Sequence, residues 1–280
     1  MPELPEAETI SRQIRDFVSG KKIISTAVNR DRAVRSNNSA EQFIKEVNGS
    51  TILTSSRRGK SILLPLDNDK TIIIRLGMSG SLYLKENNDT NNSADKHTHV
   101  IFKLENGDEL HFVDPRTFGE IIVENGHNTE NFETFKGYGY EPLHESFNSS
   151  ALQKLCKGKK SSIEALLMDQ KNVVGIGKIY SDESLFLSEI DPRRSAESIT
   201  KKEADKLIAA IKEVLSNSIE SHGTSGKDGA YRDAFRNHGT FATKLNVYQR
   251  EGKSCNRCGA TIEFVPFQGR RMHFCPKCQK

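Results

Sequence analysis

The order of hydrophobic and polar positions divides the chain into a region of short strands followed by a region of helices. At the start, a helix is predicted by apolar residues at helical spacing, namely Ile10, Ile14, Phe17 and Val18. Residues 22–123 then alternate apolar with polar positions or carry β-branched runs, with glycine- and asparagine-containing turns between them. This pattern predicts an antiparallel sandwich or barrel. The expected strands are 22–28, 51–54, 61–66, 71–76, 81–84, 100–104, 109–113 and 120–123, with a helix near 40–47.

The second half of the chain has a helical pattern. Residues 125–150 are rich in Gly, Asn, Pro and Ser, which is typical of a linker. Two polar segments are predicted to be mobile loops, residues 86–96 and the glycine-rich residues 222–239, of which the second should be exposed. Helices are expected at 162–169, 179–188 and 200–220, the last with a capping box at Thr200 and Glu203.

Length and composition indicate the class of protein. The 280 residues leave room for two domains, and fractions of 35% hydrophobic and 28% charged residues are typical of a soluble globular protein. No apolar run approaches the ~18–20 residues of a membrane span, and the acidic N-terminus does not resemble a secretory signal. Four of the five cysteines form two CxxC units, which suit a metal in a reducing compartment better than disulfides. A cytoplasmic location is therefore expected.

Positive charge is concentrated in two places. The whole chain has a net charge of +4, and residues 251–280 alone, with six basic and two acidic side chains, carry the same excess. A second cluster at residues 157–178 has five lysines against two acidic side chains. Such patches are typical of a surface that binds a polyanion such as nucleic acid, although a solvated basic face would look similar.

The first residues offer an unusual nucleophile. Removal of the initiator Met would leave the ring nitrogen of Pro2 as a free secondary amine, and an α-amino group titrates near ~8 where a lysine titrates near ~10.4. Such an amine can attack an electrophilic sugar carbon and form an iminium, with Glu3 and Glu6 as proton donor and electrostatic partner. An ordinary helix start explains the same residues, because Pro5 suits the first turn and Glu8 favours its dipole.

The strongest metal signal is the pair of CxxC units near the end of the chain. Each unit can aim two thiolates at one ion, and together they complete a tetrahedral zinc site. A closed site of four thiolates is structural, so the zinc would hold a β-hairpin. Arg270 and Arg271 would lie on this hairpin, either as solvated surface or as readers of phosphates. The four ligands are Cys255, Cys258, Cys275 and Cys278.

Three turns between predicted strands carry exposed chemistry. Met78 stands between glycines in the turn 77–80, and the turn 114–119 offers Arg116 and Phe118. Apolar wedges beside an arginine suit insertion into a duplex from which a base has been expelled. A third turn, residues 57–60, adds cations.

Two further motifs have competing interpretations. Gly175 and Gly177 precede a helix, where backbone amides could approach a phosphate or where the glycines could serve packing alone. His97 and His99 could suggest a metal, but no further ligands accompany them, so a position at a strand end is the better interpretation.

These motifs resemble those of the formamidopyrimidine-DNA glycosylases, the bacterial-type repair enzymes for oxidised purines. The similarity covers nearly the whole chain. The resemblance implies excision of 8-oxoguanine and formamidopyrimidines from double-stranded DNA, followed by β,δ-elimination, by a monomer that needs no redox cofactor. The shared motifs are PELPE at 2–6, RRGK at 57–60, LGMSG at 76–80, DPRTFG at 114–119, GIGKIYSDES at 175–184 and GRRMHFCPKCQ at 269–279.

The fold implied by the resemblance is α+β, with DNA in a cleft between two domains. An N-terminal helix and antiparallel β-sandwich would occupy residues 1–128, followed by a linker at 129–149. A helical domain with a helix–two-turn–helix would occupy 150–240, and a zinc-finger hairpin 241–280. The 222–239 loop would close over the damaged base.

The family's catalytic roles carry over to matching positions. By resemblance, Pro2 is the Schiff-base nucleophile, Glu3 the proton donor and Glu6 a supporting carboxylate. Lys60 would donate a proton in β-elimination and Arg270 in δ-elimination.

Residues that contact DNA carry over in the same way. His97, Arg116 and Lys159 match DNA-contacting positions of the family. Met78, Arg116 and Phe118 match the trio that fills the gap left by the flipped nucleotide.

Two departures and two alternatives complete the sequence picture. Lys178 replaces the family's usual Asn, and Arg75 replaces a frequent His. Because both family residues touch phosphates and both replacements are cationic, DNA contacts with a steeper salt dependence are expected.

An enzyme resembling endonuclease VIII, for oxidised pyrimidines, is one alternative function, although the three turn motifs argue against it. A catalytically silent binder of damaged DNA is the other, and retention of Met1 ahead of Pro2 would produce it.

Overall fold

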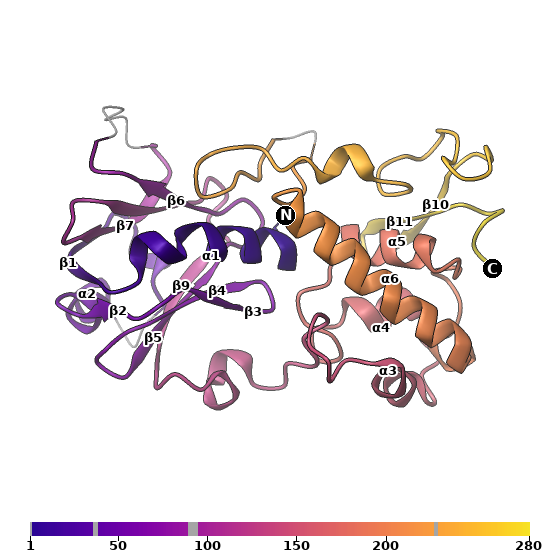
Figure 1. Cartoon of the computed structure of the whole chain (residues 1–280), viewed down its shortest axis with the longest axis horizontal. Helices are drawn as coiled ribbons and strands as arrows, with labels where there is room; N and C mark the ends of the chain where they lie inside the picture. Colours follow the sequence, from indigo (N-terminus) through magenta and orange to yellow (C-terminus); the bar gives the residue numbers. More distant parts are fainter. Residues whose placement is uncertain (1, 36–38, 89–94, 227–228) are drawn as a thin grey trace. The chain divides into compact units, whose positions relative to one another are not determined.

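The computed structural model describes residues 2–35, 39–88, 95–226 and 229–280, which form two compact units (Figure 1). The N-terminal unit comprises Met1–Lys136 and Ile219–Thr240, and the C-terminal unit comprises Gly137–Ser218 and Phe241–Lys280. Residues 219–240 thus group with the N-terminal unit, whereas the sequence placed them with the helices. Most of the predicted loop at 86–96 lies outside the described residues.

The N-terminal unit is built on two antiparallel sheets, which confirms the predicted sandwich. The larger sheet has the order β2-β1-β7-β8-β6 and the smaller β3-β4-β5-β9. Apolar strand residues and the buried face of the first helix share one core. The strands are β1 (Lys21–Val28), β2 (Thr51–Ile52), β3 (Ser56–Arg58), β4 (Ser61–Pro65), β5 (Lys70–Arg75), β6 (Ser81–Lys85), β7 (Thr98–Leu104), β8 (Glu109–Val113) and β9 (Glu120–Asn125).

Two helices accompany these sheets. Helix α1 (Leu4–Val18) buries Ile10, Ile14 and Val18 against the core, as its apolar spacing predicts. Helix α2 (Ala40–Val47) begins at Ser39, whose hydroxyl accepts a hydrogen bond from the Gln42 amide. Short 3-10 turns lie at Asp31–Ala33, Thr129–Asn131 and Glu133–Phe135.

The C-terminal unit consists of four α-helices and one hairpin among its described residues. The buried Tyr180 hydroxyl lies 2.7 Å from that of Ser218 and joins α5 to α6. No described helix combines the length and apolar character needed to span a bilayer. The elements are α3 (Ser149–Cys156), α4 (Ile163–Met168), α5 (Lys178–Leu187), α6 (Lys201–Glu220), β10 (Glu263–Phe267) and β11 (Arg270–Phe274), with 3-10 turns at Ala196–Ser198 and Phe241–Lys244.

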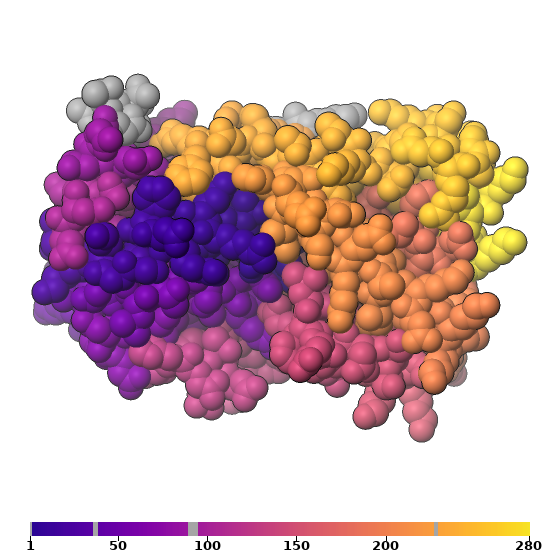
Figure 2. Space-filling view, viewed as in Figure 1, coloured from indigo at the N-terminus to yellow at the C-terminus, as the bar shows by residue number. Residues whose placement is uncertain are grey.

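The described part of residues 222–239 packs against helix α1 on one side, so the prediction of an exposed loop holds only in part: Arg232, Arg236 and His238 are exposed. Tyr231, Asp233 and Ala234 are buried. The Gln13 side chain donates to the Asp233 carboxylate at 2.8 Å and accepts from the Ala234 amide at 3.0 Å. In the space-filling view the light-orange segment that follows α6 lies beside the indigo N-terminal residues (Figure 2). The buried contacts of this loop were not predicted because Gln13, with which it pairs, lies more than two hundred residues away in the sequence.

Candidate active site

The N-terminal residues form a buried helix cap. Helix α1 begins at Leu4, and Glu3 and Glu6 form a capping box in which the Glu6 carboxylate accepts from the Glu3 amide at 2.7 Å. Both side chains are only 1% exposed, and Pro2 is buried beside them. The ordinary interpretation of this stretch as a helix start is therefore confirmed, and the same geometry brings two carboxylates next to the predicted nucleophile.

The second oxygen of Glu6 holds the loop of residues 222–239. It accepts from the Thr224 amide at 2.8 Å. Gly223 lies next to this contact with φ +85°, and a Cβ atom there would meet the Tyr231 ring at 2.8 Å and the Glu6 carboxylate at 3.0 Å. Glycine is thus required for both its conformation and its close packing. Glu6 joins the N-terminal turn to the loop that the sequence predicted to cover a damaged base.

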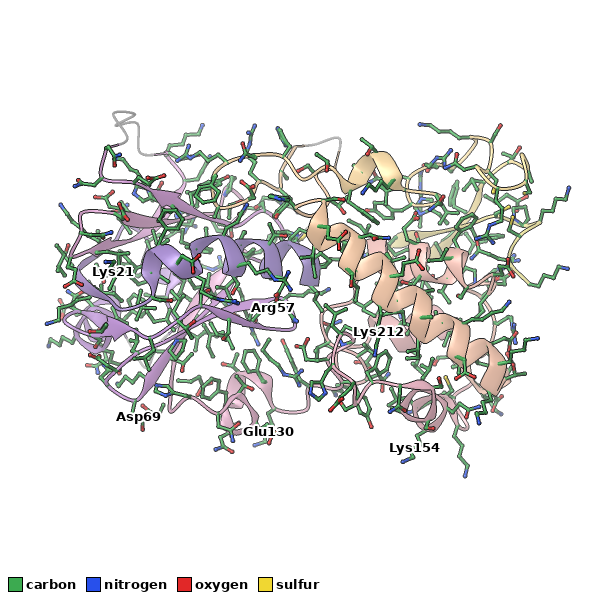
Figure 3. All side chains as sticks on the ribbon, viewed as in Figure 1. Lys21, Arg57, Asp69, Glu130, Lys154 and Lys212 are labelled. Carbon is green, nitrogen blue, oxygen red and sulfur yellow. The ribbon has the colours of Figure 1, made fainter. Side chains whose placement is uncertain are left out.

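Lys60 lies in the hairpin turn between β3 and β4, which packs on helix α1. Arg57, labelled in Figure 3, fixes this turn: its Nε atom donates to Glu8 at 2.8 Å and its Nη1 atom to the Gly59 carbonyl at 2.9 Å. Burial alone would raise the pKa of Glu8, but the guanidinium groups of Arg57 and Arg12 outweigh it and lower that pKa. The ion pair therefore holds Lys60 beside the helix that carries Glu3 and Glu6.

The turns that carry Met78 and Phe118 are joined by a buried carboxylate. Asp114 is fully buried and accepts from the Ser79 hydroxyl at 2.6 Å and from the Gly119 amide at 2.7 Å. The two turns touch so closely that a Cβ atom on Gly77 would lie 2.6 Å from the Gly119 nitrogen.

This support leaves large side chains in solvent. Met78 is 37% and Phe118 58% exposed, and the Arg116 guanidinium lies 5.3 Å from the centre of the Phe118 ring. Exposed apolar side chains beside an arginine on a rigid base have the form of a wedge for a nucleic-acid stack.

The two histidines of the predicted strand end have separate places. His99 is buried and its Nε2 atom lies 2.7 Å from the Asp114 carbonyl, so it supports the same turn. The His97 carbonyl accepts from the Asp114 amide at 3.0 Å. Neither belongs to a cluster of three or more metal-ligand side chains in the described part of the chain.

Arg75 lies on β5 with its guanidinium engaged in the N-terminal unit. Its Nη1 atom donates to Glu120 at 2.9 Å and its Nη2 atom to the Thr134 carbonyl at 2.8 Å. A phosphate would therefore have to share this group with existing acceptors. The predicted DNA contact of Arg75 stays a prediction.

The four predicted metal ligands lie together in the C-terminal unit. Their sulfur atoms are all within 4.8 Å of one another, with Cys255–Cys278 at 3.9 Å and Cys258–Cys275 at 3.5 Å. Thiolates at ~2.3 Å around a tetrahedral zinc would be about 3.8 Å apart, so the donor set fits this ion. Cys156 stands apart on α3, where burial raises the pKa of its thiol to about 11.

The hairpin of β10 and β11 places Arg270 next to its turn, paired in register with Phe267. Arg270 and Arg271 are both exposed, and the Arg271 guanidinium also pairs with Glu251 and lies 4.5 Å from the centre of the Phe264 ring. The hairpin therefore presents two cations to solvent, one of which already has an acidic partner.

The glycine motif before α5 gives a different result for its lysine. Gly175 has φ +84°, and α5 begins at Lys178. The Lys178 side chain is only 7% exposed and forms ion pairs with Glu164 and Asp182, so it points into the C-terminal unit. A contact with a phosphate would require it to point to the surface. Lys159, by contrast, is exposed after α3.

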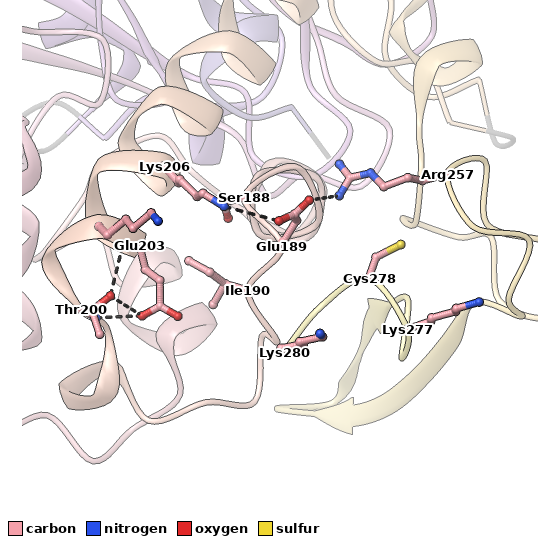
Figure 4. Close-up of a pocket in the computed structure, with 11 residues that line it drawn as sticks. Ser188, Glu189, Ile190, Thr200, Glu203, Lys206, Arg257, Lys277, Cys278 and Lys280 are labelled. Carbon is pink, nitrogen blue, oxygen red and sulfur yellow. Dashed lines mark hydrogen bonds and ion pairs between the residues drawn. The ribbon is translucent and has the colours of Figure 1, made fainter.

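A cavity of about 570 Å³ lies near the cysteine cluster, and Figure 4 shows its lining residues. Glu189 forms ion pairs with Lys206 and Arg257 in its wall, and Glu203 is tied to Thr200. Cys278 is the one predicted site residue that lines it. The proposed catalytic residues thus lie elsewhere.

The fold and these sites define a DNA-repair enzyme of the glycosylase class. Residues 1–121 match the model of the formamidopyrimidine-DNA glycosylase N-terminal domain, and residues 138–228 match that of the formamidopyrimidine-DNA glycosylase H2TH domain. The chain belongs to the formamidopyrimidine-DNA glycosylase family and is a DNA glycosylase.

Individual relatives agree over the full length. The chain is 40% identical to the formamidopyrimidine-DNA glycosylase of Wolbachia sp. subsp. Brugia malayi, with all of both chains covered. The crystal structure of the MutM (Fpg) protein from Thermus thermophilus superposes with a TM-score of 0.87 at 36% identity, covering 99% of this chain and 98% of that one. A Lactococcus lactis Fpg mutant in complex with Fapy-dG-containing DNA gives a TM-score of 0.90 at 32% identity, covering all of both chains.

The buried Asp114 carboxylate generates a first prediction. Asp114→Ala removes the acceptor for the Ser79 hydroxyl and the Gly119 amide, so the free energy of unfolding should fall by about 2–3 kcal/mol. Urea unfolding followed by circular dichroism measures this loss. The matched control is Asp16→Ala, at an exposed carboxylate on α1, which should change stability by less than about 0.5 kcal/mol. Equal stability of the two variants would contradict the role assigned to Asp114.

Proposed function

We propose that this glycosylase removes oxidised purines from double-stranded DNA through the Pro2 amine and then cuts the abasic strand. The observation that carries the proposal is the Glu3–Glu6 cap, in which the Glu6 carboxylate accepts from the backbone amide of Glu3, the residue that follows Pro2. A damaged base must be flipped out of the duplex before an enzyme can act on it. The enzyme therefore also needs side chains that fill the gap in the stack and a loop that covers the extruded base.

The reaction begins with the ring nitrogen of Pro2, freed by removal of Met1. Its lone pair forms a bond to C1′ of the flipped nucleotide, the bond from C1′ to the damaged base breaks, and Glu3 supplies the proton for this step. Opening of the sugar ring gives an iminium, which acidifies the proton on C2′. Loss of that proton expels the 3′ phosphate, and a second elimination expels the 5′ phosphate. Lys60 assists the first elimination and Arg270 the second.

The exposed turns of the N-terminal unit supply the wedge. Met78, Arg116 and Phe118 together fill the space left by the flipped nucleotide. His97, Lys159 and Arg75 complete the DNA contacts. The 222–239 loop, anchored by Glu6, covers the extruded base.

Zinc is the metal we propose for the four cysteines. Cys255, Cys258, Cys275 and Cys278 would hold it through sulfur alone, as suits a closed structural site. The ion stabilises the β10–β11 hairpin and takes no part in the reaction. Arg270 and Arg271 depend on this hairpin for their positions.

A covalent intermediate is the first test of the mechanism. Borohydride should reduce the iminium and leave a permanent cross-link between the N-terminal peptide and DNA carrying 8-oxoguanine. Pro2→Gly keeps an amine but loses its secondary character, so turnover should fall by at least about tenfold, while the affinity for an uncleavable abasic analogue changes by less than about threefold. Single-turnover kinetics and peptide sequencing provide the measurements.

Two controls belong to this experiment. A tag fused ahead of Pro2 should leave DNA binding intact and abolish cleavage. Glu3→Gln should lower base release more than binding, because a carboxamide cannot deliver a proton. A cross-link that maps to Lys60 or another lysine would exclude the mechanism.

The lesion preference is tested with a panel of duplexes. The chain's turn motifs favour oxidised purines, so 8-oxoguanine opposite cytosine should be excised faster than thymine glycol or 5-hydroxyuracil. The comparison is informative because the wild-type Lactococcus lactis Fpg, 32% identical and with a TM-score of 0.89, was crystallised with DNA containing an oxidised pyrimidine. The reverse order of single-turnover rates would favour the pyrimidine-specific alternative.

The zinc proposal predicts a defined metal content. Cys258→Ser should reduce zinc from about one ion per chain to near zero and abolish tight DNA binding, while the β-sandwich stays folded. Elemental analysis and circular dichroism measure the two effects. The matched control, Cys156→Ala, should retain its zinc. Full metal content in Cys258→Ser would overturn the assignment.

A further inference from the structure

A buried cluster of charged side chains lies between α4, α5 and β11 in the C-terminal unit. The Lys178 ammonium forms ion pairs with Glu164 on α4 and with Asp182 one turn further along α5. Both carboxylates are completely buried. One cation therefore serves two acidic groups from two helices.

The cluster extends to the hairpin that carries Arg270. The second oxygen of Asp182 lies 2.9 Å from Nδ1 of His273, which is buried on β11 three residues after Arg270. The Tyr248 ring packs edge-on against His273 with ring centres 5.5 Å apart. Asp182 is thus held by Lys178 on one side and holds β11 on the other.

The two carboxylates need the lysine. Burial raises the pKa of both carboxyl groups, and the charge of Asp182 also raises that of Glu164, whereas the Lys178 ammonium lowers both pKa values and so favours the charged forms. One oxygen of Glu164 has no hydrogen-bond partner among the described residues. Removal of the ammonium would leave two acidic groups in a dry interior without a counter-ion, which is strongly unfavourable.

We propose that Lys178 is a positioning residue, which fixes the β10–β11 hairpin to α5 through Asp182 and His273 and so sets the place of Arg270. It is not a phosphate ligand. The proposal rests on the proposed function only in taking the hairpin as a DNA-binding element. It replaces the expectation that a cation at this position adds a contact to DNA.

Two substitutions distinguish the two roles. Lys178→Met should reduce the affinity for a duplex with an abasic analogue by about tenfold or more, because the hairpin loses its support. Adding Glu164→Gln leaves one buried carboxylate beside His273, and the double variant should recover to within about threefold of Glu164→Gln alone. Methionine cannot bind a phosphate, so a lost phosphate contact could not be recovered in this way. Failure of the second substitution to restore binding would overturn the proposal.

Salt dependence gives an independent reading. In the double variant, the slope of log K against log salt should match that of Glu164→Gln, whereas loss of one phosphate contact would lower it by about 0.9. The matched control is Lys154→Met, which removes an exposed lysine of α3, labelled in Figure 3, and should leave affinity within about twofold. A slope lowered by one contact in the double variant would also overturn the proposal.

Hydrogen exchange separates this proposal from the proposed function, because it requires no DNA. Amides of β11 should exchange at least about tenfold faster in Lys178→Met and return toward wild-type rates in the double variant. Unchanged exchange in Lys178→Met would refute the positioning role. If the wild-type protein failed to bind damaged DNA while the exchange pattern held, the proposed function would fail and the positioning role would stand.

Discussion

The N-terminal unit depends on the two oxygens of one buried carboxylate, that of Glu6. One oxygen accepts from the Glu3 amide and the other from the Thr224 amide, 218 residues further along the chain. A buried carboxylate is costly unless it is hydrogen-bonded, so the helix cap and the returning loop stabilise each other. This constraint helps to explain why residues 219–240 belong to the N-terminal unit although Gly137–Ser218 fold in the other unit. The residues next to the proposed nucleophile are therefore fixed by tertiary structure as well as by the helix start.

Asp114 applies the same physical principle to the exposed turns. Its carboxylate is completely buried and joins backbone and side-chain donors of two separate turns, while Met78 and Phe118 remain in solvent. This arrangement reverses the usual distribution, in which carboxylates are exposed and large apolar groups are buried. The buried carboxylate stabilises both turns. In the proposed function, the same support would keep the exposed side chains in place for insertion into a nucleic-acid stack.

The sequence predicted those parts of the fold that have a local period. The sandwich strands and helix α6 follow from apolar spacing, and the cysteine cluster follows from two CxxC units. Strand β3 was not predicted because Ser56, Arg57 and Arg58 show no alternation of apolar and polar residues. It is recognised only from its antiparallel pairing with β4. The buried side of the 222–239 loop and the inward direction of Lys178 were not predicted, because both segments are polar and their partners Gln13 and Glu164 lie on other helices, although Asp182 is a local partner one turn from Lys178.

The hairpin of β10 and β11 is flanked in the sequence by the four clustered cysteines and contacts a buried ion pair through His273. Two five-residue strands are marginal on their own, and the buried apolar side chains of β11, Met272 and Phe274, are few. The thiolates hold the knuckles at the base of the hairpin, but they do not determine its direction relative to α5. Glu183 of α5 accepts from the amides of Val247 and Tyr248 and anchors the chain that enters the finger. Contact with β11 itself is made by Asp182 through His273, so the direction of Arg270 depends on a carboxylate whose charge Lys178 balances.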